Sequence, residues 1–421
     1  MAMTLECAVC SRRHALGELA WRCAGCGGVL DLAGFTAAVP GPAVLAGRRP
    51  GMWRYAEALP LPEPVAVSLG EGMTPLVTAP GRPDVRLKID YLMPSGSFKD
   101  RGAVLLAALA VRLAPSRLVA DSSGNAGAAI AAYAARAGLP CDVYVPAATS
   151  AGKVGQLHAY GATVHRIDGS REDTADAAAR AVEEPGVLYA SHVHNPFFLH
   201  GTKTYVLELF EQLGGRLPDT LVLPVGNGTL VLGAHLGARE LLAQGLVPRL
   251  PRIVAVQAAA CAPLAAAFRL GLAVPGPDGG TDGGTDGGTD GGPDGGGTIA
   301  EGIAIARPAR GAQILAAVRD TGGEIVTVTD DEVRVAHTAL ARAGLYVEPT
   351  SAVCWAAVTA GLAGTAAPAP DPHGPDAGVA GAEAAGAGPR LVVPLCGTGL
   401  KSRPPDAVRR PPERVAPSRT G

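Results

Sequence analysis

The chain has 421 residues, of which 48% are hydrophobic, and its 36 basic and 38 acidic residues leave a net charge of −2. This length predicts two or three domains with a sizeable core. The balanced charge gives no reason to expect nucleic acid or a membrane surface as a partner, so we expect a small-molecule substrate. The first residues lack a basic segment followed by an apolar stretch, and no apolar run is long enough to span a bilayer, which favours the cytoplasm.

The first 34 residues carry four of the eight cysteines, as two pairs separated by twelve residues: Cys7 and Cys10, then Cys23 and Cys26. A segment this short buries too little apolar surface to fold unaided. Four thiolates at this spacing are typical of a closed tetrahedral zinc site, in which the metal is structural. We therefore predict a zinc ribbon over residues 1–34, with His14 in solvent rather than among the ligands.

From residue 85 onward, short β-rich runs alternate with Ala-rich helical stretches. The expected strands span 85–90, 117–121, 141–145, 221–224 and 253–257, and the expected helices span 98–113, 125–137 and 152–160. This alternation predicts an α/β protein with parallel sheets covered by helices.

Low-complexity stretches at 277–297 and 363–389 interrupt this pattern, and neither composition can build a packed core. We expect 98–200 to form a small α/β domain and 201–402 a large domain around the two inserts. Residues 35–97 would then supply a linker and part of the large domain, and 403–421 a disordered tail.

The segment from Ser95 to Gly102 places Lys99 at the start of an expected helix, directly after a Ser-Gly-Ser turn. A lysine is unusual there, because the helix dipole disfavours a cation at a helix N-terminus. If Lys99 formed an imine with a carbonyl cofactor, the free ammonium group would be absent from this helix start. The alternative interpretation is that Lys99 is an ordinary surface lysine in the first turn of a helix.

Three further turns follow apolar strands and contain glycine and small polar residues. The first, Ser122-Ser123-Gly124-Asn125-Ala126, has backbone N–H groups that suit a carboxylate, and Asn125 adds an amide donor. The second, Gly226-Asn227-Gly228-Thr229, suits a phosphate at a helix start. The third turn lies within 394–401 (PLCGTGLK), where Cys396 or Thr398 would face a cofactor ring. A single glycine turn of this kind is weak evidence, because tight turns use glycine without binding anything.

Together and in this order, the four elements resemble those of fold type II pyridoxal-phosphate enzymes, and most closely threonine synthase. Further resemblance lies in 70–76 (GEGMTPL), 201–204 (GTKT), 301–304 (EGIA) and 348–352 (EPTSA). The likeness covers about residues 5 to 402 outside the two inserts and implies a tryptophan synthase β-like fold of two domains.

The same resemblance implies a role for each candidate site residue. Lys99 would hold pyridoxal 5'-phosphate as a Schiff base, next to Phe98, and would act as general base once released. Asn125 would meet the phenolic oxygen and Cys396 the ring nitrogen. The phosphate would bind at Gly226, Asn227, Gly228 and Thr229, and the substrate carboxylate at Ser122, Ser123, Gly124 and Ala126.

The leading function implied is a lyase of amino-acid biosynthesis that converts O-phosphohomoserine into threonine and phosphate. A serine or threonine dehydratase-like lyase is the alternative, because Phe198 stands where the family usually has a basic residue, and because Ala126 and Gly127 are small. Arg101, Lys153 and Lys203 are candidate cations for a substrate phosphate. A catalytically silent protein that binds the cofactor and zinc is a further alternative, and a homodimer is one expected assembly.

Overall fold

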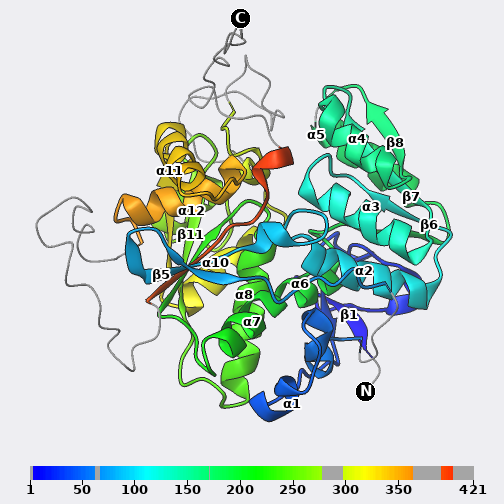
Figure 1. The fold of residues 1–421 in the computed structure, drawn as a ribbon. Helices are drawn as coiled ribbons and strands as arrows, with labels where there is room; N and C mark the ends of the chain where they lie inside the picture. The colour runs from blue at the N-terminus through cyan, green and yellow to red at the C-terminus, as the bar shows by residue number, and fades with distance from the viewer. Residues whose placement is uncertain (1–2, 62–66, 170, 277–296, 364–389, 402–421) are drawn as a thin grey trace, which may run out of the picture.

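The computed structural model describes residues 3–61, 67–169, 171–276, 297–363 and 390–401. Within these ranges the chain forms three sheets and the helices that cover them (Figure 1). The expected inserts lie outside the described residues except for positions 297 and 363, and the expected tail lies outside them entirely. None of the helices in the described ranges combines the length and hydrophobicity needed to cross a bilayer.

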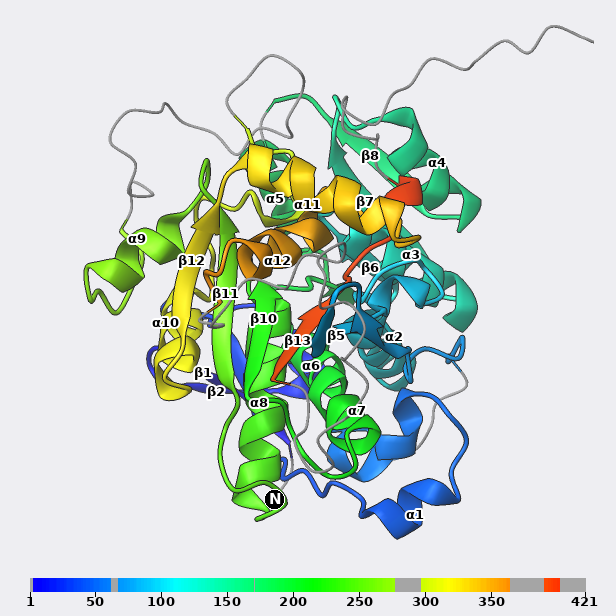
Figure 2. The ribbon, with the colours of Figure 1, turned by 60° about the vertical axis from the view of Figure 1, so that its left-hand side comes forward.

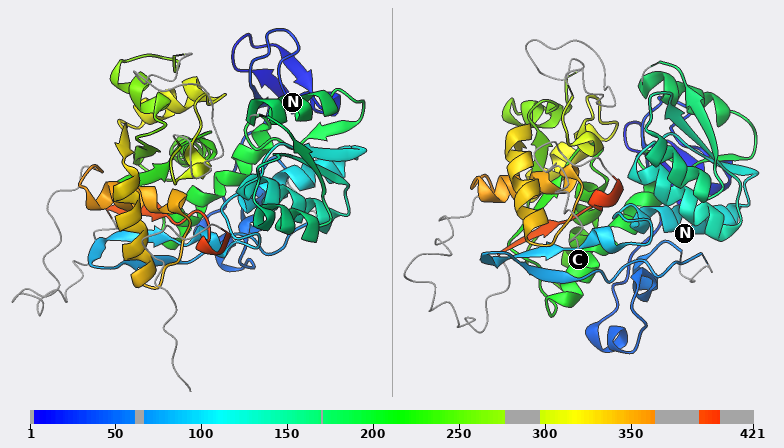
Figure 3. Two further views of the ribbon diagram at one scale, coloured as in Figure 1. Left: turned by 90° about the horizontal axis from the view of Figure 1, so that it is seen from above. Right: turned by 45° about the horizontal axis from the view of Figure 1, so that its top comes forward.

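The first sheet, which we call the ribbon, is antiparallel with the order β2-β1-β3. Its strands are β1 (Thr4–Cys7), β2 (Arg13–Ala15) and β3 (Leu30–Ala33). Figure 3 shows the ribbon, in dark blue, on the same side of the molecule as the four-stranded sheet described next. A short helix, α1 (Pro42–Ala46), follows it.

The second sheet has four parallel strands in the order β8-β7-β6-β9, and with its helices it forms what we call the small lobe. Its strands are β6 (Arg117–Ala120), β7 (Cys141–Pro146), β8 (Thr163–Ile167) and β9 (Val187–Tyr189). Its helices are α2 (Asp100–Leu113), α3 (Asn125–Ala137), α4 (Ala151–Ala159) and α5 (Arg171–Ala181).

Residue types explain the bounds of these helices. Helix α3 contains alanine, the strongest helix former, at most of its positions, and it ends at Gly138, which adopts the left-handed conformation that suits glycine. Near its start, a Cβ on Gly127 would lie 1.9 Å from the carbonyl oxygen of Ser122. The loop before α3 can therefore fold back onto the helix only because position 127 is glycine.

The third sheet has six strands in the order β12-β11-β10-β13-β5-β4, and only β4 is antiparallel to its neighbour. We call this sheet and its helices the large lobe. Its strands are β4 (Leu76–Ala79), β5 (Arg82–Lys88), β10 (Thr220–Pro224), β11 (Arg252–Ala258), β12 (Glu324–Val328) and β13 (Leu391–Pro394). Its helices are α6 (Pro196–Thr202), α7 (Thr204–Gln212), α8 (Thr229–Ala243), α9 (Pro263–Arg269), α10 (Gly311–Asp320), α11 (Asp330–Arg342) and α12 (Pro349–Thr359).

The last strand of the sequence is a central strand of this sheet: β13 lies between β10 and β5 (Figure 2). All four of its residues are buried, as expected for a parallel strand covered on both faces. The expected fold class, parallel sheets covered by helices with a small N-terminal module, is confirmed. Parallel strands end at one edge of the sheet, so the loops that follow β10 and β13 lie close together there.

Candidate functional site

Lys99 stands at the junction of an extended segment and helix α2. Ser97 pairs with Gly397, and the backbone N–H of Phe98 donates to the carbonyl of Cys396 at 2.9 Å. These contacts tie the segment to the chain that leaves β13. Lys99 caps α2, and its Nζ donates to Thr229 Oγ1 at 3.1 Å. The Lys99 amine therefore joins the beginning of α2 to the beginning of α8.

The surroundings of Lys99 disfavour its charged form. Its Nζ lies 4.7 Å from the ring centroid of Phe98 and 5.6 Å from that of Phe198, which is fully buried. Burial lowers the pKa of Lys99 to about 8, against a smaller opposing effect of Cys396 and Glu348. A lysine with this pKa supplies a substantial fraction of neutral amine near pH 8, which both nucleophilic attack and proton abstraction require.

The turn from Gly226 to Thr229 connects β10 to α8, and it packs so closely against its neighbours that only glycine fits at positions 226 and 228. Gly228 has φ of +74°, and a Cβ there would lie 2.3 Å from Ile314. A Cβ on Gly226 would lie 2.9 Å from the Cα of Ile303. The first N–H groups of α8 have no acceptor within the helix, so the turn provides the donors that a phosphate group binds.

A second helix start, that of α3, lies after β6. Gly124 is the N-cap residue, and its N–H lies 3.4 Å from the Ser122 hydroxyl. Ser122, Ser123 and Gly124 are half-buried, and Ala126 is buried. The free N–H groups of this helix start suit a carboxylate.

Asn125 has a partner that sequence analysis missed. Its Nδ2 donates to both carboxylate oxygens of Glu348, at 3.1 and 2.8 Å, and its Oδ1 accepts from Lys401 Nζ at 3.4 Å. Burial raises the pKa of Glu348, and the Asn125 amide and the charges of Lys401, Lys153 and Lys99 oppose that rise. Sequence analysis placed Glu348 in the segment 348–352 that resembles the family but gave it no contact, and its position before the proline that begins α12 is also that of an ordinary N-cap.

Cys396 follows β13 and is buried, and burial raises the pKa of its thiol far above the usual value. The thiol is therefore neutral at physiological pH. Ser97 is fully buried on the neighbouring segment, and within the described residues its hydroxyl has no hydrogen-bond partner. A buried hydroxyl without a partner is costly, so this position fits a bound polar group. The described residues therefore fit pyridoxal phosphate: they offer the Lys99 amine, a glycine turn whose N–H groups suit a phosphate, and the unsatisfied hydroxyl of Ser97.

The three candidate cations for a substrate phosphate are all engaged in ion pairs. Arg101 is fully buried against Asp90 and Glu208, and Lys203 Nζ lies 2.7 Å from Glu240. Lys153 differs from both, because it is partly exposed and bridges from α4 of the small lobe to Glu301 of the large lobe at 2.6 Å. Of the three, Lys153 alone has a partly exposed side chain.

Arg101 belongs to a closed network of charges beneath the site. Its guanidinium donates to Asp90 at 2.8 and 2.9 Å and to Glu208 at 2.6 and 2.9 Å. Lys88 Nζ donates to Glu208 at 2.7 Å and to the Thr74 carbonyl at 2.7 Å. All four charged side chains are fully buried, so two positive and two negative charges balance without solvent. The network fixes the first turn of α2, and with it Lys99, to the large lobe.

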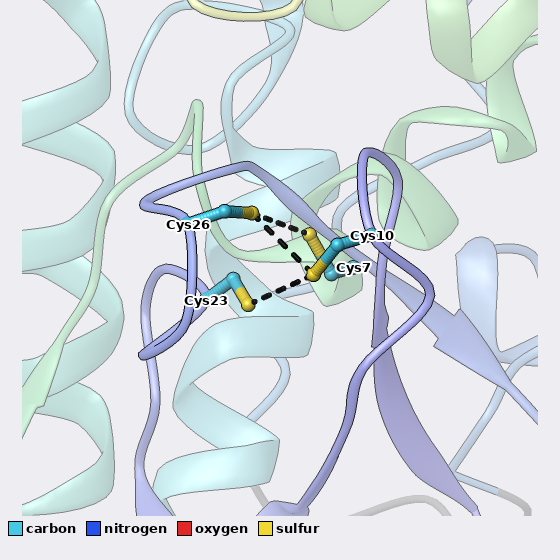
Figure 4. A group of neighbouring side chains, drawn as sticks. All are labelled: Cys7, Cys10, Cys23 and Cys26. Carbon is cyan, nitrogen blue, oxygen red and sulfur yellow. Dashed lines mark hydrogen bonds between the residues drawn. The ribbon is translucent and has the colours of Figure 1, made fainter.

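The four ribbon cysteines converge, as Figure 4 shows. Their sulfur atoms all lie within 4.8 Å of one another, and the pairs Cys7–Cys26, Cys10–Cys23 and Cys10–Cys26 are 3.5 to 3.6 Å apart. Tetrahedral zinc with bonds of about 2.3 Å would place sulfurs about 3.8 Å apart, so the cluster has the right size. The prediction that His14 is solvated is wrong: its side chain is 5% exposed and contacts Cys23, because β2 turns it into the ribbon.

Comparison with known proteins agrees with this geometry. A family model described as pyridoxal-phosphate dependent enzyme matches residues 67–370. Threonine synthase of Methanosarcina acetivorans is 33% identical over 357 residues, which cover 83% of this chain and 84% of that protein. Threonine synthase of Synechocystis is 37% identical over 295 residues, 68% of this chain and 71% of that protein.

Solved structures share the fold. Maize serine racemase superposes with a TM-score of 0.60 at 22% identity, over 77% of this chain and 88% of its own. A fungal L-serine ammonia-lyase from Rhizomucor miehei superposes with a TM-score of 0.58 at 21% identity, over 77% of this chain and 93% of its own. The family model and the relatives lead to one conclusion: the chain belongs to the pyridoxal-phosphate-dependent enzymes, in their threonine synthase-like branch.

Proposed function

We propose that Lys99 holds pyridoxal 5'-phosphate and that this site carries out elimination and replacement on a small amino acid. The observation that carries the proposal is the Lys99 amine, which has a pKa lowered to about 8 and lies 3.1 Å from Thr229 at the start of α8. The cofactor, when bound, supplies an electron sink that stabilises negative charge at the substrate α-carbon.

The residues around it have distinct roles in this proposal. Lys99 accepts the α-proton as a neutral amine, and Thr229 orients that amine. Gly226, Asn227, Gly228 and Thr229 bind the cofactor phosphate, while Asn125 and Cys396 contact the ring. The start of α3, from Ser122 to Ala126, binds the substrate carboxylate. Phe98 and Phe198 exclude water from the amine.

For the substrate we propose O-phosphohomoserine, converted to threonine and phosphate. Relatives named threonine synthase support this choice. The charges of Lys153 and Lys401 both act on Glu348, which contacts Asn125, so both lysines lie within electrostatic range of the site. Two cations there would offset the desolvation of a substrate phosphate, which is prohibitive without them.

A dehydratase-like lyase acting on serine or threonine is the second candidate. It is favoured by Phe198, a fully buried ring 5.6 Å from the Lys99 amine, at the position where a basic residue was expected. An aromatic wall beside the reacting atoms suits a small, uncharged leaving group better than a phosphate.

Steady-state assays with O-phosphohomoserine, serine and threonine distinguish the two candidates. Phosphate release with formation of threonine supports the first, and it should weaken in Lys401→Met and Lys153→Met, each chosen to keep the aliphatic stem without the charge. Release of ammonia and a keto acid from serine or threonine, unaffected by those substitutions, would replace the first candidate with the second.

We propose that the four ribbon cysteines hold one structural zinc ion, since a four-thiolate shell leaves no position for substrate. We also propose domain bounds at about residues 34, 97 and 200, a cytoplasmic location and a homodimer. Metal analysis and light scattering of the purified protein test the zinc and the dimer.

A further inference from the structure

Arg310 is a buried arginine at a junction of three parts of the chain. It directly precedes α10 in the large lobe, and its side chain is 0% exposed. The guanidinium donates to the carbonyls of Val193 at 2.6 Å, of His194 at 3.0 Å and of Leu30 at 2.7 Å, and to the Asp31 carboxylate at 2.7 Å. A single side chain thus holds β3 of the ribbon and the segment that leads from β9 to α6.

Neighbouring contacts strengthen this junction. Gln313 donates to the second oxygen of Asp31 at 2.6 Å, and it accepts from Arg310 at 2.8 Å. On the ribbon side, the Trp21 ring packs edge-on against Tyr189 and His194, with ring centroids 5.2 and 5.0 Å apart. The ribbon is therefore fastened to residues 189–194 by both polar and aromatic contacts.

The segment held by Arg310 leads directly into the site. Asn195 follows it and caps α6, accepting from the Phe197 N–H at 3.0 Å. Phe198 directly follows Phe197, and its ring centroid lies 5.6 Å from Lys99 Nζ. Three residues of backbone thus separate the His194 carbonyl from Phe198.

Helices α6 and α2 are packed so closely that two positions on their contact admit only glycine. A Cβ on Gly102 would lie 2.3 Å from the Phe198 ring, and a Cβ on Gly201 would lie 2.0 Å from the Arg101 carbonyl oxygen. A void of about 10 Å³ is lined by ribbon residues Leu5, Leu16 and Leu19, by Leu109 and Leu113 of α2, and by Asn195 and Phe197 at the start of α6. Any movement of the ribbon would reach the walls of the Lys99 site through these contacts.

We propose that Arg310 is a positioning residue through which the metal-holding ribbon fixes α6 and places the Phe198 ring beside Lys99. The proposal rests on the cofactor site and the ribbon zinc of the proposed function. It gives the N-terminal module a role in catalysis without any contact with the substrate. Loss of the metal and loss of Arg310 should then perturb the same structural element.

The test is a double-mutant cycle on the full-length holoenzyme, with Arg310→Gln, Cys23→Ser and the double variant. Misplacement of a wall residue by about 1 Å costs up to about 100-fold in rate, so we expect each single variant to lower kcat/KM by about 10- to 100-fold. The double variant should be no worse than the more impaired single variant, because the two substitutions break the same linkage between the ribbon and α6. The visible absorbance of the bound cofactor and hydrogen exchange of α6 should change in all three.

Two further variants control the test. Arg310→Lys keeps the positive charge but loses the planar set of guanidinium N–H donors, so it should behave like Arg310→Gln. If the role of Arg310 were purely electrostatic, Arg310→Lys would instead retain the activity of the wild-type protein. Arg249→Gln removes an exposed arginine paired with Asp219 and should change nothing. If Arg310→Gln does not fold, Asp31→Asn weakens only the ribbon side of the junction and should shift the absorbance and α6 exchange in the same direction.

Multiplicative losses in the double variant would overturn the proposal, as would unchanged kcat/KM, absorbance and exchange in Arg310→Gln. If the wild-type protein turned over none of the three substrates, the proposed function would fail, but absorbance and α6 exchange would still decide the role of Arg310.

Discussion

Replacing Glu208 with glutamine should destabilise the large lobe by several kcal/mol. Glu208 is one of two carboxylates that balance Lys88 and Arg101, and all four side chains are fully buried. Glu208→Gln keeps the shape of the side chain and leaves a net charge of +1 with no access to water. A buried charge without a partner is the costly state, whereas a balanced or fully apolar replacement is tolerated.

Two estimates of the stability lost in Glu208→Gln agree, one from the pKa of Glu208 and one from the usual cost of removing one partner of a buried ion pair. Burial by itself would raise the pKa of Glu208, but the charges of Arg101 and Lys88 outweigh it and lower the pKa from 4.5 to about 2. That difference corresponds to about 3 kcal/mol of stability, present above pH 4.5 and lost as the pH falls through about 2. Removal of one partner of a buried ion pair costs about 3–5 kcal/mol, so we expect a loss of about 3 kcal/mol or more at pH 7.

Urea denaturation of the holoenzyme, followed by tryptophan fluorescence, measures this loss. The control is Glu208→Gln combined with Lys88→Met, which restores the balance of charge and should recover most of the stability. A loss below about 1 kcal/mol in the single variant, or a double variant worse than the single one, would refute the reasoning.

Three further predictions concern the cofactor and the metal. Lys99→Ala should be colourless, and a visible band that borohydride still reduces in this variant would show that another lysine holds the cofactor. The rate at which the apoprotein takes up pyridoxal phosphate should rise with pH up to about 8 and then level off, because the pKa of Lys99 is lowered to about 8. A rate still climbing at about pH 10 would indicate an ordinary lysine. Protein purified under reducing conditions should contain one zinc per chain, and Cys23→Ser should lose it and expose the N-terminal strands to hydrogen exchange first. Metal-free protein with an unchanged N-terminus would contradict the zinc site.

Much of the fold could be predicted because local and global preferences agree. Helix 125–137 was predicted with its observed bounds, since the alanines favour a helix and Gly138 ends it. Helix α2 begins at Asp100 rather than at the predicted 98, because Ser97 and Phe98 pair with Gly397 and Cys396 from the other end of the chain. Pairing with a distant segment leaves no local signal in the sequence.

The missed parts of the site are contacts between distant residues. Glu348 reaches Asn125 across more than 200 positions, and Arg310 reaches Asp31 across 279. Neither pair has a spacing or composition that marks it. His14 was misjudged for a related reason: a lone polar residue after a turn gives no sign that a strand will direct it inward.

The central place of β13 has a consequence for how the chain is made. The small-lobe strands β6 to β9 are contiguous in sequence, so that sheet can close while synthesis continues. Strand β5 must wait for β13, which emerges roughly 300 residues later. At about 5–20 residues per second, that delay is about 15–60 s, during which one edge of β5 has no partner. A nascent chain that stalls before residue 391 would therefore expose an apolar strand edge, and such chains are expected to depend on chaperones more than the finished protein does.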